Sequence, residues 1–113
     1  MDYLETALDV GINAVRLAAR LCQTVQAQIT DDVLEKKDRS PVTIADFGSQ
    51  AIICRALQNE LGDVTVVGEE DSAELRDGDH SQFLDRICEE LSAVDVQSTH
   101  EEACRWIDIG NGD

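Results

Sequence analysis

The sequence predicts an α/β class of fold that is mostly helical over these residues, an α+β arrangement with a long antiparallel helix pair and one short strand. Two observations support this prediction. Apolar residues recur every three or four positions over residues 3–29 and 44–61, and a β-branched run fills residues 64–67 before a glycine. A chain of 113 residues is the size of one domain or part of one, so residues 1–113 form a single predicted unit.

The first helix is predicted over residues 3–29, because its apolar positions are separated by steps of three and four. The predicted buried stripe contains Leu4, Leu8, Ile12, Val15, Ala19, Cys22, Val25 and Ile29. Gly11 costs this helix little, so we expect it to continue unbroken through that residue.

The second helix is predicted over residues 44–61, with its start near Thr43 or Asp46. Pro41 disfavours helical geometry at the residue before it, and both Thr and Asp are good N-caps. The predicted buried stripe contains Phe47, Ala51, Cys54, Leu57 and Leu61. The polar connector at residues 30–42 is expected to return this helix antiparallel to the first.

The remaining elements are shorter. Residues 64–67 are predicted to form a buried strand, and residues 81–93 a third helix. Thr99 and Glu102 have the spacing of a capping box, which predicts a last short helix that buries Ala103, Trp106 and Ile107.

The chain is strongly acidic, with a formal net charge of −15. This charge argues against binding to a nucleic-acid polymer or an anionic membrane surface, because both need basic patches. The four cysteines are far apart and give little support for a zinc site. With no leader-like start, we expect an intracellular, cytoplasmic protein, or an organellar one if a targeting segment has been removed.

Two acidic positions are candidates for chemistry. Asp46 stands where a helix begins, so it is either a helix cap or one edge of a divalent-cation site. Glu69 and Glu70 follow the predicted strand, and ligand sites in α/β sheets lie beyond the carboxyl ends of strands. A solvated acidic turn is the alternative for these two residues.

A family resemblance adds to this interpretation. Ser40-Pro41-Val42-Thr43 with Asp46, followed by Val66-Val67-Gly68-Glu69-Glu70-Asp71-Ser72, resembles the lithium-sensitive, magnesium-dependent superfamily of inositol monophosphatase and fructose-1,6-bisphosphatase. Residues 37–50 and the closing Ile107-Asp108-Ile109-Gly110 are most similar to its 3′(2′),5′-bisphosphate nucleotidase branch. The resemblance covers nearly the whole chain and implies the N-terminal part of a layered phosphatase fold.

The resemblance also implies site residues. It makes Glu69 a Mg²⁺ ligand and Asp46 the acid that helps to activate the attacking water, with Thr43 (catalytic) and Glu70 (metal) as weaker assignments. The implied substrate is a small nucleotide bisphosphate, 3′-phosphoadenosine 5′-phosphate, which is hydrolysed to AMP and phosphate. No substrate-binding residue and no oligomeric state are predicted.

One family motif is missing from the sequence. The superfamily's central metal motif, Asp-Pro-Ile-Asp-Gly-Thr, does not occur in residues 1–113. We therefore expect this chain to correspond to an N-terminal portion that is inactive by itself. Two alternatives remain open: a non-catalytic helical interaction module, and a phosphatase for inositol or sugar phosphates.

Overall fold

Four helices make up most of the part of the chain that the computed structural model describes, which is residues 3–27, 40–62, 65–73, 75–76 and 81–112. These helices are α1 (Tyr3–Ala27), α3 (Ser40–Leu61), α4 (Ser81–Ala93) and α5 (His100–Asp108). The four helices lie close to the predicted ranges. The α1 helix passes through Gly11 without a break, as predicted.

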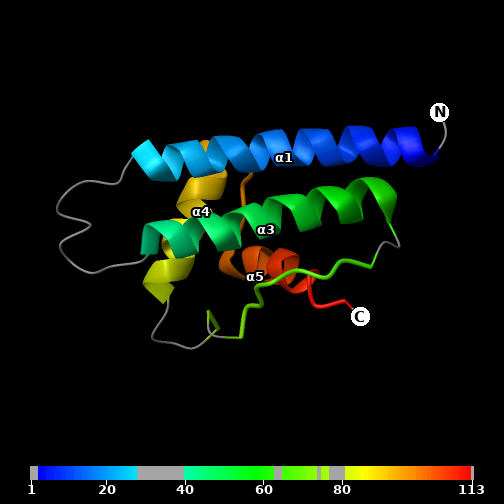
Figure 1. Cartoon of the computed structure of the whole chain (residues 1–113). Coiled ribbons are helices and arrows are strands. Elements are labelled where there is room, and N and C mark those ends of the chain that lie inside the picture. Colours follow the sequence, from blue (N-terminus) through cyan, green and yellow to red (C-terminus); the bar gives the residue numbers. More distant parts are fainter. Residues whose placement is uncertain (1–2, 28–39, 63–64, 74, 77–80, 113) are drawn as a thin grey trace.

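The two long helices α1 and α3 run antiparallel, which confirms the predicted pair (Figure 1). They approach closely where Gly48 of α3 faces Leu21 of α1. A Cβ atom at Gly48 would lie only 2.9 Å from the Leu21 Cδ1 atom, and the Leu21 side chain is fully buried. A glycine at this position therefore allows α3 to pack against a large side chain of α1.

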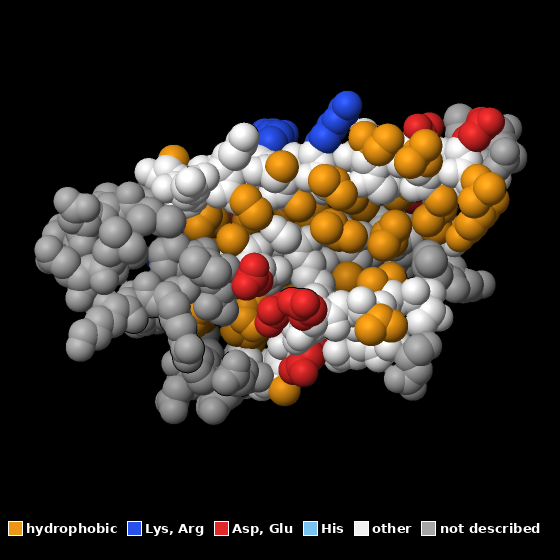
Figure 2. All heavy atoms as spheres, viewed as in Figure 1, with side chains coloured by type: hydrophobic (Ala, Val, Ile, Leu, Met, Phe, Trp, Pro, Cys, Tyr) orange, Lys and Arg blue, Asp and Glu red, His pale blue; other side chains and the backbone are white. Residues whose placement is uncertain are grey.

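The predicted buried stripe of α1 is wrong. Its buried residues are Val10, Ala14, Ala18, Leu21 and Val25, so only Val25 was placed correctly among the described positions. Leu4, Leu8, Ile12 and Val15 are instead 76, 63, 41 and 58% exposed. Figure 2 shows apolar side chains along the outer side of α1. Two faces of this helix are apolar, and α3 packs against the one with smaller residues, where the helix axes can come closer.

The α3 helix begins earlier than predicted, at Ser40, with Pro41 in its first turn. Proline is tolerated there because the first backbone N–H groups of a helix have no intrahelical acceptor. Asp46 therefore lies inside the helix, and its predicted alternative role as an N-cap is wrong. The helix ends as expected before Gly62, which has a φ of 72°.

The predicted buried strand at residues 64–67 is also wrong where the structure describes it, since residues 65–66 are not in a strand and Val67 is 74% exposed. Val64 lies outside the described residues. Val67 forms an isolated antiparallel bridge with Asn111, and the Gly68 N–H donates to the Gly110 carbonyl oxygen over 2.7 Å. An extended segment becomes a strand only along a partner, and residues 110–112 are the only described backbone that pairs with it. The layered family fold stays a prediction.

The two short helices complete the core: both pack against α3 and against each other, and α4 also contacts α1 (Figure 1). The α4 helix buries Leu84, Ile87 and Leu91, as predicted. The capping box of α5 is confirmed: the Glu102 N–H donates to Thr99 Oγ1 over 3.1 Å, and the Thr99 N–H donates to Glu102 Oε1 over 2.9 Å. The α5 helix buries Ala103, Trp106 and Ile107, also as predicted.

The four cysteines are free thiols, and two of them are core residues. Burial raises the pKa of the Cys54 thiol, and it also raises that of Cys104. Cys22 is exposed and lies 3.3 Å from the Ser49 hydroxyl. Cys54 and Cys104 are thus small apolar core residues, as expected. Among the described helices, none is long and apolar enough to span a bilayer.

Candidate functional site

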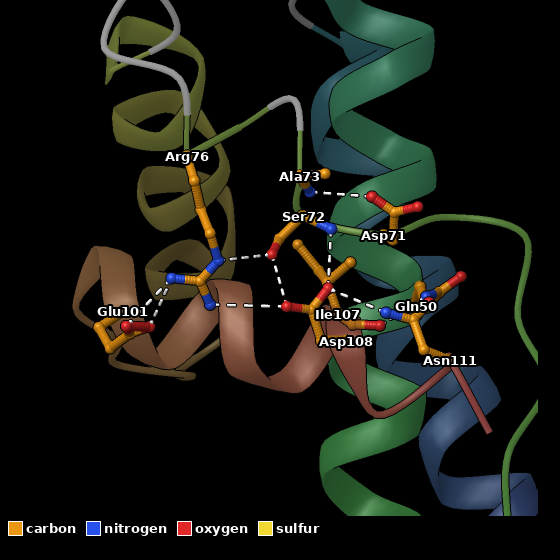
Figure 3. Close-up of polar contacts among 9 residues, drawn as sticks. All are labelled: Gln50, Asp71, Ser72, Ala73, Arg76, Glu101, Ile107, Asp108 and Asn111. Carbon is orange, nitrogen blue, oxygen red and sulfur yellow. Dashed lines mark hydrogen bonds and ion pairs between the residues drawn. The ribbon is translucent and has the colours of Figure 1, made fainter.

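The acidic turn at residues 69–72 is bound to the middle of α3 through one side chain. Gln50 Nε2 donates to the Glu70 carbonyl oxygen over 2.7 Å, and the Glu70 N–H donates to Gln50 Oε1 over 3.0 Å. Gln50 Nε2 also donates to the Ile107 carbonyl oxygen over 2.7 Å, near the end of α5. Three segments that are distant in the sequence therefore meet at this amide (Figure 3).

A second cluster lies beside it and connects Ser72 to α5. The Ser72 N–H and hydroxyl donate to the two carboxylate oxygens of Asp108, over 2.8 and 2.6 Å. Arg76 Nε donates to Ser72 Oγ over 2.9 Å, and the Arg76 guanidinium contacts Glu101 at 3.0 Å and Asp108 at 3.5 Å. The hydrogen bond from Arg76 lowers the pKa of Glu101. This cluster fixes the end of the acidic turn, as Figure 3 shows.

The predicted site residues lie on either side of this junction. Glu69 is exposed and Glu70 is half-buried on the turn. Asp46 is exposed on α3, four residues before Gln50, and residues four apart share one face of a helix. Asp46 therefore lies on the α3 face that meets the turn. Thr43 is in the first turn of α3.

The carboxylates are the right type of ligand for a magnesium ion, but too few of them lie close together in the described part of the chain. Carboxylate oxygens are the ligands that a hard cation prefers. In the part of the chain that the structure describes, however, no three Asp, Glu, His or Cys side chains are close enough together to hold a metal ion. The described residues of this chain do not form a complete magnesium site by themselves.

The predictions did not assign a role to three residues of the junction. These residues, Gln50, Ser72 and Asp108, belong to the segments that carry the family resemblance. The sequence placed each of them in a motif but predicted no contact or function for it. A signal was present in Gly68 and Gly110. A Cβ atom at either glycine would lie 2.5 Å from the Gln50 side chain amide. Glycines at the two contact points indicate a close approach between segments.

Two surface grooves lie elsewhere. One of about 340 Å³ opens between α1 and α3, and its lining includes Asp9, Asn13, Arg55 and Asn59. The other, of about 500 Å³, follows the exposed apolar side of α1 beside Leu8, Ile12 and Val15. Among the residues whose side chains the structure describes, Asp46, Glu69 and Glu70 line neither groove, so the candidate site remains the junction of α3 with the acidic turn.

Comparison with known proteins shows that the sequence is similar to several plant nucleotidases. The chain is 48% identical over 86 residues to 3′(2′),5′-bisphosphate nucleotidase 1 of Arabidopsis thaliana, covering 74% of this chain and 24% of that protein. It is 46% identical over 80 residues to a 3′(2′),5′-bisphosphate nucleotidase of Oryza sativa, covering 67% and 22%. A protein called probable 3′(2′),5′-bisphosphate nucleotidase 3 of Arabidopsis thaliana aligns over 125 positions at 46% identity, covering all of this chain and 35% of that protein. No family model matches the chain.

These relatives share a common class, that of nucleotidases. The chain belongs to the 3′(2′),5′-bisphosphate nucleotidase family, which confirms the family resemblance seen in the sequence. It spans about a quarter to a third of the length of the relatives it matches.

Proposed function

We propose that residues 1–113 supply a cation-binding glutamate and a proton-accepting aspartate to a phosphatase that hydrolyses 3′-phosphoadenosine 5′-phosphate to AMP and phosphate. The names of the relatives support the nucleotidase class. The observation that carries the proposal is the attachment of the Glu69-Glu70 turn to α3 through Gln50, four residues after Asp46. This contact joins the two motifs at one place.

In this proposal each side chain has a separate task. Glu69, with Glu70, contributes carboxylate oxygens to Mg²⁺, and residues outside this chain complete the ligand set. When bound, the cation neutralises phosphate charge and polarises the phosphoryl oxygens. Asp46 accepts a proton from the attacking water, and Thr43 assists from the first turn of α3. An acidic chain can thus serve an anionic substrate, because the cation supplies the positive charge.

The 113-residue chain alone is expected to release no phosphate from any monoester, because most of the cation's ligands are missing. Its binding of Mg²⁺ should be weak and independent of substrate. The purified chain is assayed for release of phosphate from 3′-phosphoadenosine 5′-phosphate with excess Mg²⁺. Phosphate release that stops on chelation would show that this chain already contains a complete site.

A chimera tests the proposed function itself. Residues 1–113 replace the matching segment of Arabidopsis 3′(2′),5′-bisphosphate nucleotidase 1, and the product is assayed with 3′-phosphoadenosine 5′-phosphate, inositol monophosphate and fructose-1,6-bisphosphate. We expect the nucleotide to be the best substrate. If the chimera prefers either of the other two compounds, the proposed substrate class changes to inositol phosphates or sugar phosphates. A folded chimera without activity on any of them would favour a non-catalytic helical module.

A further inference from the structure

The Gln50 side chain pairs with both backbone polar groups of Glu70, as a residue of a neighbouring strand would do. Its amide oxygen accepts from the Glu70 N–H, and its amide nitrogen donates to the Glu70 carbonyl oxygen and to that of Ile107. Because the peptide bond is planar, holding the Glu70 N–H also fixes the carbonyl group and Cα atom of Glu69. One side chain therefore orients the backbone from which both carboxylates extend.

The space around this amide is closely matched to it. A Cβ atom at Gly68 would lie 2.5 Å from Gln50 Oε1, and one at Gly110 would lie 2.5 Å from Gln50 Nε2. Gly68 and Gly110 are themselves joined by a backbone hydrogen bond of 2.7 Å. The amide has little freedom to shift, so its hydrogen bonds define one position of the acidic turn.

We propose that Gln50 is a positioning residue: it sets the Glu69-Glu70 turn in the geometry on which divalent-cation binding depends. This inference rests on the proposed function for its cation. The donor pattern makes the residue type specific. A glutamate at position 50 would present carboxylate oxygens to the two carbonyl oxygens of Glu70 and Ile107, and a methionine would supply no hydrogen bond of comparable strength.

The test uses the 113-residue chain with Gln50→Met and Gln50→Glu, which keep the approximate size of the side chain. Gln58→Met is the matched control, since Gln58 is exposed on the same helix. Ile52→Val is a second control, because it removes a methylene group from a buried side chain of the same helix without altering the Gln50 amide. It separates a general loss of stability from a loss of positioning.

The first measurement is hydrogen exchange at the Glu70 amide, followed by NMR. We expect this amide to be protected in the wild-type chain, and to exchange faster in both Gln50 variants. Protection of amides inside α4 should be unchanged in the Gln50 variants. In both controls the ratio of protection at the Glu70 amide to protection inside α4 should stay at its wild-type value. Equal protection of the Glu70 amide in the wild type and Gln50→Met would overturn the positioning role, whatever the cation does.

The second measurement is a titration with Mn²⁺ alone, read from paramagnetic broadening of the signals of residues 68–72. Residues that orient metal ligands typically change metal affinity 10–100-fold when removed. We expect roughly a tenfold weaker Mn²⁺ affinity for Gln50→Met, which adds no carboxylate that could itself bind the cation, with both controls unchanged. Equal affinity in the wild type and Gln50→Met overturns the inference. If the wild type shows no broadening at this turn, the cation role in the proposed function fails instead, and the exchange result alone decides whether Gln50 positions the turn.

Discussion

Ser72 and Asp108, which are 36 residues apart in the chain, are joined by two hydrogen bonds of 2.8 and 2.6 Å. The pair connects the end of the acidic turn to the end of α5, and Ser72 is 1% exposed. A buried hydroxyl and backbone N–H both depend on one carboxylate for their hydrogen bonds. The geometry of the candidate site thus depends on a residue, Asp108, that lies far from it in the sequence.

The first prediction is that Asp108→Ala lowers the free energy of unfolding by about 1–3 kcal/mol, because two donors of Ser72 lose a charged acceptor. Asp108→Asn should cost less, since it keeps one acceptor oxygen. Glu89→Ala, an exposed change on α4, is the control. Urea unfolding followed by circular dichroism measures all three. Equal stability of Asp108→Ala and Glu89→Ala would mean that this pair does not hold the turn.

The second prediction compares two leucines of α1. Leu21 is fully buried and Leu8 is 63% exposed. Leu21→Ala should therefore cost about 2–5 kcal/mol of unfolding free energy, whereas Leu8→Ala should change it by less than about 0.5 kcal/mol. Both variants replace leucine with alanine within α1 and so change the intrinsic helix propensity by the same amount, which means that the difference in unfolding free energy reports burial. The reverse order, measured by the same urea unfolding, would restore the stripe that periodicity predicted.

The α1 helix shows how far apolar periodicity alone reaches. The spacing predicted the helix correctly, because apolar residues on any face of a helix recur with the same period of about 3.6 residues, whether one face or two are apolar. Which face of α1 is buried depends on α3, where Gly48 leaves space for the Leu21 side chain. No local pattern within residues 3–27 contains that information. Capping, by contrast, is local, and Thr99 with Glu102 was predicted from four consecutive residues.

The acidic turn shows the other limit. Residues 64–67 have strand propensity, but a strand forms only beside another, and the structure describes one isolated bridge at Val67. The motifs identified the segments that meet at the site. They did not identify Gln50 as the residue joining them, because Gly68 and Gly110 indicate a close approach without specifying its partner, and residues 50 and 107 are far apart in the sequence.

The third prediction concerns acid. The Arg76 hydrogen bond lowers the pKa of Glu101 below 4.5, the ordinary value of a glutamate carboxyl. A lowered folded-state pKa stabilises the fold above the unfolded pKa, and this contribution is lost as pH falls through the folded value. The wild type should therefore have a slightly higher melting temperature than Glu101→Gln at neutral pH. This gap between the two melting temperatures should close well below pH 4.5. Both residues are exposed, so added salt should also narrow the gap. A gap that widens in acid would contradict this assignment.

The fourth prediction separates two roles of Asp46. Since Asp46 lies inside α3 and is exposed, Asp46→Asn should leave the thermal stability of the 113-residue chain unchanged. In the chimera described above, the same change should reduce kcat roughly 10²–10⁴-fold, because an amide cannot accept the proton of the attacking water. Glu60→Gln, on the same helix and also exposed, is the control. A kcat equal to that of the control would remove Asp46 from the catalytic residues.

The magnesium dependence of the Glu69→Gln chimera is the most direct test of the proposed site. Glu69 is exposed, so its carboxylate is accessible to a cation. An amide is a poorer Mg²⁺ ligand than a carboxylate. Phosphate release from 3′-phosphoadenosine 5′-phosphate is measured over a range of Mg²⁺ concentrations, with Glu89→Gln as the control. We predict that Glu69→Gln shifts half-maximal activity to a much higher Mg²⁺ concentration, while the control follows the parent chimera. Superimposable Mg²⁺ curves for Glu69→Gln and the parent would contradict the assignment of this turn as a cation site.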